Sequence, residues 1–230
     1  MIKEFEINAF NYYMKNKQEV STAIELDGLT ATRERVIESN LPPIRKNLQS
    51  IPFPNLKKRG VYVVEFIGNG ISSRALIRKG TLRLLEKIGP AGHEFRILDE
   101  KNQICEKATL WFNDKEYSLK DGVILIPFSN NPGNRTVILR DGDFASLARF
   151  NHLGENYRLK VGFHIDRESL RSGEKATLLV RPSLRLNGYP TSLNLLEEIQ
   201  LVITTYDHEN QPTRMEVPIE KFNPLEEFAH

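Results

Sequence analysis

Short runs in which hydrophobic and polar residues alternate, each bounded by turn-forming residues, recur along most of the chain. A period of two is typical of β-strands, whose successive side chains point to opposite faces. In residues 108–112, for example, Ala108, Leu110 and Phe112 form one face and Trp111 lies on the other. The remaining predicted strands lie within residues 61–66, 82–84, 121–128, 135–144, 156–165, 175–190 and 200–207. This spacing predicts an all-β chain of antiparallel sandwiches.

The segment Gly68-Asn69-Gly70 allows two interpretations, a phosphate-binding turn or a β-hairpin. A dinucleotide fingerprint requires a third glycine, where this chain has Ser73. The stretch between Ile71 and Lys79 is also shorter than the roughly dozen residues that a parallel crossover needs. Asn-Gly between two alternating runs favours a hairpin with a type I′ turn.

Helix is predicted to be scarce. The first fifteen or so residues have loose helical spacing, and Ser192–Ile199 is long enough for two helical turns. Neither segment resembles a crossover helix between parallel strands, so an α/β sheet is disfavoured.

One weak internal repeat is present: DEKNQ at residues 99–103 and DHENQ at residues 207–211 each follow a predicted strand. Because Asp and Asn are natural turn formers, we expect equivalent turns in two related β modules rather than a binding motif. Together with turn-rich stretches at 88–92 and 150–156, the repeat predicts three parts, residues 1–89, 90–151 and 152–230. Whether the two terminal parts are complete domains stays open.

Composition narrows the class of protein. The chain of 230 residues is 40% hydrophobic and 27% charged with a net charge of +2, so it carries no strong field toward nucleic acid or an acidic membrane. The N-terminus carries Glu4 and Glu6 and has no apolar core of a secretory signal, and no apolar run is long enough to span a membrane. We expect either a cytosolic protein or a piece whose export signal lies elsewhere.

No catalytic or metal-binding constellation is visible. The single cysteine, Cys105, is expected to be a small core or edge residue, and the five histidines show no metal-ligand spacing. Asp141 and Asp143 would supply only two calcium ligands, so the segment RDGDF (residues 140–144) is interpreted as a tight turn. Basic residues in 55–60 and 76–83 are interpreted as protection of strand edges. The sequence thus predicts no enzyme, no cofactor and no metal.

Three segments together resemble bacterial alpha-2-macroglobulin-like proteins. RGVYVVEFIGNGISSRALI (residues 59–77) resembles the closing hairpin of a macroglobulin-type domain. Residues 163–193, with Gly173-Glu174 before a long strand, resemble the opening of another. Residues 94–129 resemble a small transthyretin- or carboxypeptidase-regulatory-like β unit. The chain departs from the family at Ser172, where Pro is usual, and lacks the Cys-Gly-Glu-Gln thioester motif.

The resemblance implies tandem immunoglobulin- or macroglobulin-like sandwiches around a transthyretin-like unit, in an extracytoplasmic protein of the periplasm or cell envelope. It implies a non-enzymatic structural or interaction module whose partners are neighbouring domains or another protein, including proteases. The alternative function is a carbohydrate- or peptide-binding β module. The candidate ligand-contact residues for that alternative are Trp111, Tyr117 and Tyr189. Neither nucleic acid nor direct membrane insertion is expected.

Overall fold

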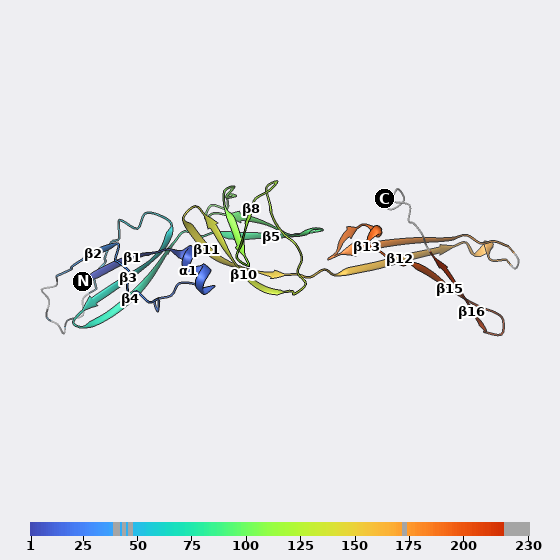
Figure 1. Cartoon of the computed structure of the whole chain (residues 1–230), viewed down its shortest axis with the longest axis horizontal. Coiled ribbons are helices and arrows are strands. Elements are labelled where there is room, and N and C mark those ends of the chain that lie inside the picture. Colours follow the sequence, from blue (N-terminus) through green and yellow to red (C-terminus); the bar gives the residue numbers. More distant parts are fainter. Residues whose placement is uncertain (39–41, 43–44, 46–47, 172–173, 219–230) are drawn as a thin grey trace. The chain divides into compact units, whose positions relative to one another are not determined.

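A computed structural model describes residues 1–38, 42, 45, 48–171 and 174–218. The predicted all-β fold of antiparallel sheets is confirmed (Figure 1). By its internal contacts the chain divides into two compact units, Met1–Gly154 and Glu155–His230, which are described separately below.

The first module, residues 1–80, is built on a four-stranded sheet of order β2-β1-β3-β4. Its strands are β1 (Ile2–Ile7), β2 (Arg33–Arg35), β3 (Gly60–Gly68) and β4 (Ile71–Lys79). The predicted hairpin is confirmed, because Asn69 and Gly70 take φ values of 52° and 76° between the antiparallel strands β3 and β4. Positive φ at both central residues is the geometry of a type I′ turn.

The N-terminal segment contains one helix, α1 (Ala9–Asn16), preceded by a strand rather than by further helix. The side chain of Asn8 caps the helix by accepting a hydrogen bond from the N–H of Asn11, and Lys17 ends it in the left-handed conformation. Residues 2–7 are a strand because each of them pairs with a residue of β3 in the middle of the sheet. The predicted helical spacing is confirmed over Ala9–Asn16 and is wrong over Ile2–Ile7, where sheet pairing outweighs a loose local pattern.

The second module, residues 81–154, is a sandwich of two sheets, with orders β11-β10-β7-β8 and β5-β6-β9. Its strands are β5 (Arg83–Gly89), β6 (Gly92–Leu98), β7 (Thr109–Phe112), β8 (Lys115–Ser118), β9 (Ile124–Ile126), β10 (Gly133–Asp141) and β11 (Phe144–His152). The predicted alternation is borne out in β7, where Leu110 and Phe112 are buried and Trp111 is half-buried on the other face. The segment RDGDF is confirmed as a tight turn, with Gly142 at a φ of 61°.

One apolar core fills the space between the two sheets of the second module. Phe95 and Ile97 of β6 meet Leu110 of β7 and Leu139 of β10, all four without exposed surface. Burial of side chains of this size contributes about 1.5–3 kcal/mol each relative to exposure. The sandwich therefore holds its own core.

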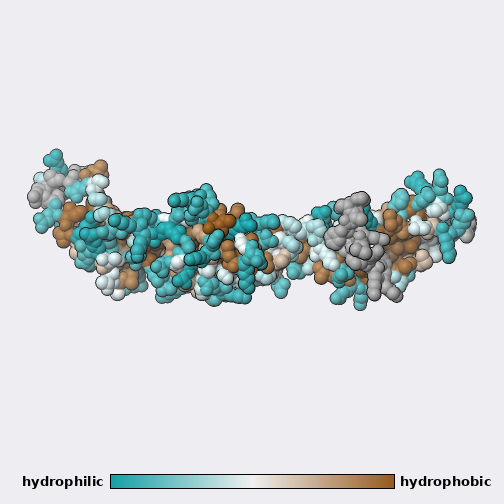
Figure 2. Space-filling model, turned by 90° about the horizontal axis from the view of Figure 1, so that it is seen from above, coloured by the Kyte–Doolittle hydropathy of each residue, from teal (hydrophilic) through white to brown (hydrophobic). Residues whose placement is uncertain are grey.

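The C-terminal unit, from Glu155, contains a three-stranded sheet of order β12-β13-β14 and a separate hairpin, β15-β16. Its elements are β12 (Tyr157–Ile165), η1 (Arg167–Ser169), β13 (Leu178–Leu186), β14 (Tyr189–Thr191), η2 (Leu193–Leu195), β15 (Gln200–Tyr206) and β16 (Pro212–Pro218). Hydrophobic side chains reach the surface of this unit (Figure 2). Leu159 and Phe163 of β12 are 49% and 60% exposed. The two helical turns predicted over Ser192–Ile199 are reduced to η2, because Leu196 already takes extended backbone angles.

The two repeated segments form the same turn. In each, the N–H of the first aspartate donates to the carbonyl of the last glutamine, at 2.9 Å from Asp99 to Gln103 and 3.2 Å from Asp207 to Gln211. The Oδ1 atom of each aspartate also accepts the N–H groups two and four residues ahead. The asparagine of each takes positive φ, 61° at Asn102 and 64° at Asn210. The interpretation as equivalent turns is confirmed.

The three-part division at 89/90 and 151/152 stays a prediction. Gly89 pairs with Gly92 at the tip of the β5–β6 hairpin, and His152 is the last residue of β11. The Gly173-Glu174 pair quoted for the resemblance lies in part outside the described residues, as do Ser172 and His230.

Candidate functional site: the junction of the first two modules

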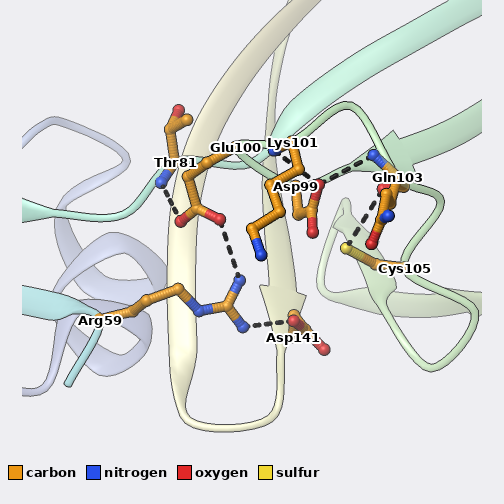
Figure 3. Close-up of polar contacts among 8 residues, drawn as sticks. All are labelled: Arg59, Thr81, Asp99, Glu100, Lys101, Gln103, Cys105 and Asp141. Carbon is orange, nitrogen blue, oxygen red and sulfur yellow. Dashed lines mark hydrogen bonds and ion pairs between the residues drawn. The ribbon is translucent and has the colours of Figure 1, made fainter.

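The connection between the first and second modules is short and closely held. β4 ends at Lys79 and β5 begins at Arg83, so only Gly80, Thr81 and Leu82 link the two. Leu82 is 5% exposed and belongs to the core of the second module. The N–H of Thr81 donates to Oε1 of Glu100 at 3.0 Å (Figure 3). The chain therefore passes from one module into the core of the next without a free linker.

Gly80 is the residue that permits this passage. Its φ is +95°, and a Cβ added there would stand 2.9 Å from Cγ of Arg59 and 2.9 Å from Oε1 of Glu100. Residues with a side chain rarely adopt this backbone conformation, and the space is already occupied. A glycine between two predicted strands was the one sequence signal of this junction.

Arg59, directly before β3, bridges the two modules (Figure 3). Its guanidinium donates a hydrogen bond to Oδ2 of Asp141, at the end of β10, and lies 4.0 Å from Oε2 of Glu100. It also stacks over the ring of Phe144 at 5.0 Å. The hydrogen bond to Asp141 raises the pKa of Arg59 further, so the positive charge is permanent. A guanidinium shared by two carboxylates and a ring fixes direction as well as distance.

The ionised carboxylate form of Glu100 is stabilised at the junction. Its pKa is lowered by hydrogen bonds from its own backbone N–H and from that of Thr81, and less strongly by the charge of Arg59. Its side chain is 39% exposed, so the solvent screens these interactions considerably.

Apolar packing across the junction is more extensive than the polar contacts. One buried cluster combines Ala9 and Tyr13 of α1 with Ile138 of β10 and Ala145 of β11, and thus includes both modules. The ring of Phe10 meets the indole of Trp111 edge to face at 5.2 Å, and the guanidinium of Arg140 covers Phe10 at 4.6 Å. The helix of the first module is therefore packed on the outer face of the second module's larger sheet.

A further ion pair joins Lys17, at the end of α1, to Asp114 in the β7–β8 turn at 3.0 Å. Both side chains are largely exposed, so we expect little stabilisation from this pair. The pair adds to the contact between the two modules but contributes little to its stability.

The basic residues near the first hairpin act on loops of the same module. Arg74 and Arg78 donate to the backbone carbonyls of Ile24 and Val20, and Lys79 donates to that of Leu56. They fasten the segments around the sheet, and the edge protection expected for residues 55–60 and 76–83 stays a prediction.

Cys105 is half-buried against the core of the second module, with Sγ 4.0 Å from the carbonyl oxygen of Gln103. Burial raises the pKa of its thiol, and the nearby charge of Asp141 adds to this effect. The thiol is thus held in its less reactive, protonated form near neutral pH.

His93 is completely buried at the other end of the second module. Its Nε2 accepts the N–H of Leu153 at 3.0 Å, so the proton resides on Nδ1, which lies 2.6 Å from Oε1 of Glu86 and donates to it. His152 donates from Nε2 to the carbonyl of Pro127 at 2.8 Å. Both histidines are structural hydrogen-bonding groups within an aromatic cluster.

Two of the three candidate ligand-contact residues, Trp111 and Tyr117, lie on opposite faces of the larger sheet of the second module. Trp111 faces α1, whereas Tyr117, opposite Leu110 in the β7–β8 pair, points to the other face and packs against the core. Tyr189 is half-buried in β14 of the C-terminal unit. Their role in binding stays a prediction.

Neither a metal site nor a membrane-spanning helix is found among the residues that the structure describes. In the part of the chain that it describes, no three His, Cys, Asp or Glu side chains come together in a way that would hold a metal ion. Within residues 1–38, 42, 45, 48–171 and 174–218, no helix combines the length and the apolar character that crossing a bilayer requires.

Comparison with known proteins identifies immunoglobulin-like domains at both ends of the chain. Residues 1–80 match the model of the AbpF first immunoglobulin-like domain, and residues 166–230 match that of the AbpF third immunoglobulin-like domain. The chain is 40% identical over 220 residues to Actin-binding protein F of Dictyostelium discoideum. That match covers 92% of this chain and only 9% of the relative. No solved structure gives a significant match.

These findings correct the resemblance to bacterial alpha-2-macroglobulin-like proteins, which was wrong. The macroglobulin-type function and the extracytoplasmic location depended on that resemblance and are wrong with it, and the carbohydrate- or peptide-binding alternative fits no better. The physical reason is that alternating strands and Asn-Gly or Asp-Gly turns are common to unrelated sandwiches. The all-β, immunoglobulin-like fold class is shown by the sheets and by both family models.

Proposed function

We propose that this chain is a non-enzymatic, immunoglobulin-like segment of a cytoplasmic protein that associates with actin filaments, and that residues 1–154 serve in it as a rigid scaffold. The observation that carries the proposal is the buried cluster shared by the first two modules, in which Ala9 and Tyr13 pack with Ile138 and Ala145. Two modules that share a buried core form a rigid pair, whereas modules joined only by a flexible linker move independently.

Three features of the junction support rigidity. The connector of Gly80, Thr81 and Leu82 is too short to act as a flexible linker, because Leu82 is already buried in the core of the second module. The helix α1 lies against β10 and β11. Arg59 adds a directional polar contact to Asp141. Rotation of one module against the other would break all three at once, so the cost of bending is high.

The proposed partner derives from the relative. Actin-binding protein F is 40% identical over 220 residues, and identity at this level over nearly the whole chain supports a common architecture and a common cellular setting. Because the chain spans 9% of that protein, actin contact by this particular segment is a proposal. The second module, between the segments that match a first and a third immunoglobulin-like domain, stands where a second domain of the series would.

Co-sedimentation with filamentous actin tests the proposal. The 230-residue chain is expected to pellet with filaments in a saturable manner and to remain in the supernatant without them. Microtubules serve as the control, because they are also acidic polymers and report unspecific charge attraction. A chain that stays in the supernatant at every filament concentration, or that pellets equally with both polymers, would contradict specific actin contact.

A further inference from the structure

The hairpin of β12 and β13 has two chemically different faces. Exposure alternates along β13: Val180 and Pro182 are half-buried and Leu184 is buried, whereas Arg181 and Arg185 between and beyond them are exposed. In an immunoglobulin-like sandwich the apolar face of a sheet faces the core and the polar face is solvated. The arginine side is therefore the more polar of the two faces, and on the other face of β12 Leu159 and Phe163 are also 49% and 60% exposed.

Strand β12 places further positive charge on the same face. In the antiparallel register Arg158 lies opposite Arg185, Lys160 opposite Ser183 and Gly162 opposite Arg181. Residues directly opposite one another share a face of the sheet. We call the surface formed by Arg158, Lys160, Arg181 and Arg185 the basic face. His164 and Leu179 continue it at the far end of the hairpin.

The two strands themselves supply no negative charge to this face. Neither β12 nor β13 contains an aspartate or glutamate. Among the described residues, Arg158 and Lys160 enter none of the ion pairs, and both are exposed. Like charges directly opposite in a sheet destabilise it, so the Arg158–Arg185 pair costs folding free energy. Because this like-charge pair lowers the stability of the fold, we infer that the two arginines serve another purpose, such as binding a partner.

The placement of apolar residues argues for a protein partner rather than a lipid surface. A membrane-binding surface presents apolar and basic side chains together, with the apolar ones inserted between headgroups. Here Leu159, Val161 and Phe163 lie on the face opposite to Arg158 and Lys160, because they occupy the alternate positions of β12. In these two strands Leu179, at the far end of the hairpin, is the one apolar side chain that shares the basic face. A flat, basic, solvated sheet face is complementary to an acidic protein surface.

We propose that the basic face of the C-terminal unit binds an acidic surface of the actin filament. This inference rests on the proposed function and goes further by assigning the contact to Arg158, Lys160, Arg181 and Arg185. Binding through exposed charges of this kind accelerates association and weakens as salt is added.

The test compares two charge-reversal variants of the full chain in actin co-sedimentation. Arg158→Glu with Lys160→Glu alters the basic face, whereas Arg171→Glu with Lys175→Glu makes the same charge change on exposed residues outside the two strands. We expect the first variant to lose about tenfold or more in affinity at low salt, and the second to bind within about twofold of the original chain. Affinity of the original chain is expected to fall with increasing salt.

A stability measurement separates lost binding from lost folding. Arg158→Glu places a carboxylate opposite Arg185 and replaces a like-charge pair by an opposite-charge pair. The variant is therefore expected to melt at the same temperature or higher while it binds less, which misfolding could not produce.

Three outcomes would overturn the inference. If both variants bind actin as the original chain does, the basic face is not the contact, and the proposed function survives. If the original chain pellets with anionic phospholipid vesicles and not with actin, the chain binds a lipid surface rather than an acidic protein surface. If the original chain binds neither, the proposed actin contact fails and this inference fails with it.

Discussion

The guanidinium of Arg59 and the carboxylate of Asp141, 82 residues apart in the sequence, form a hydrogen-bonded ion pair between two β modules. Arg59 precedes the central strand of the first module, and Asp141 ends a strand of the second. The pair lies beside Gly80, where the chain crosses from one module to the other. Its position makes it a direct reporter of whether the two modules keep one orientation.

Substitution of Gly80 should destabilise the first unit strongly. Gly80→Ala forces a side chain into a φ of +95° and against Arg59 and Glu100, so we expect a loss of about 2–4 kcal/mol in the free energy of unfolding. Gly70→Ala is the matched control, since Gly70 has a φ of +76° with nothing within 4 Å, and it should cost about 1–2 kcal/mol. Denaturant titration measures both. Equal losses would show that the crowding at Gly80 is not significant.

The Arg59–Asp141 pair should show a measurable coupling. In a double-mutant cycle with Arg59→Met and Asp141→Asn, we expect a coupling energy of about 1 kcal/mol, because both side chains are largely shielded, at 34% and 25% exposure. The same cycle on the exposed Lys17–Asp114 pair should give about 0.5 kcal/mol or less. A coupling at Arg59–Asp141 no larger than that of the exposed pair would contradict the bridging role.

Trp111 offers an optical probe of the junction, because it is the single tryptophan of the chain. Phe10→Ala removes the ring that covers its indole and should shift the fluorescence emission to longer wavelength, with a loss of about 2–4 kcal/mol in stability. Phe163→Ala, an exposed ring of the C-terminal unit, should leave the emission unchanged. If Phe10→Ala does not alter the emission, α1 does not rest on Trp111 in solution.

Acidification should weaken the junction through Glu100. Its pKa is lowered in the folded chain, so its stabilising contribution is complete above the ordinary carboxyl pKa and is lost as the pH falls through the lowered value. Glu100→Gln keeps an acceptor for the Thr81 N–H but removes the titrating charge. Melting temperatures measured from about pH 6 to about pH 3 should therefore decline less in this variant than in the original chain.

The control for the acid series is Glu106→Gln, on an exposed residue that takes no part in the contacts of Glu100 with Arg59 and Thr81. It should follow the pH profile of the original chain. A Glu100→Gln profile that is as steep as that of the original chain would show that Glu100 does not contribute to the acid sensitivity.

Local structure was predictable where the residues themselves specify the backbone. Asn69-Gly70 and Asp121-Gly122 both adopt positive φ in turns between antiparallel pairs, as their types favour. The asparagines of the two repeated turns, Asn102 and Asn210, also adopt positive φ. The helix start at Asn8 also had a local signal, since asparagine is a preferred N-cap.

The junction was not predictable, because its contacts depend on the path of the chain. Nothing near Asp141 in the sequence indicates Arg59, and the segment RDGDF by itself specifies only a turn. Period-two alternation tells which face of a strand is buried but not which strands pair, so it cannot separate one family of sandwiches from another. The incorrect family resemblance and the unpredicted contact of Phe10 with Trp111 have this same origin.

The relative orientation of the first two modules is tested most directly by backbone N–H residual dipolar couplings of the 230-residue chain in a dilute alignment medium. Alignment tensors are fitted separately to the structured residues of the first module and of the second. A shared core and the Gly80 connector predict two tensors with the same magnitude and the same principal axes. Tensors that differ in magnitude, as for modules moving on a flexible joint, would contradict the rigid scaffold.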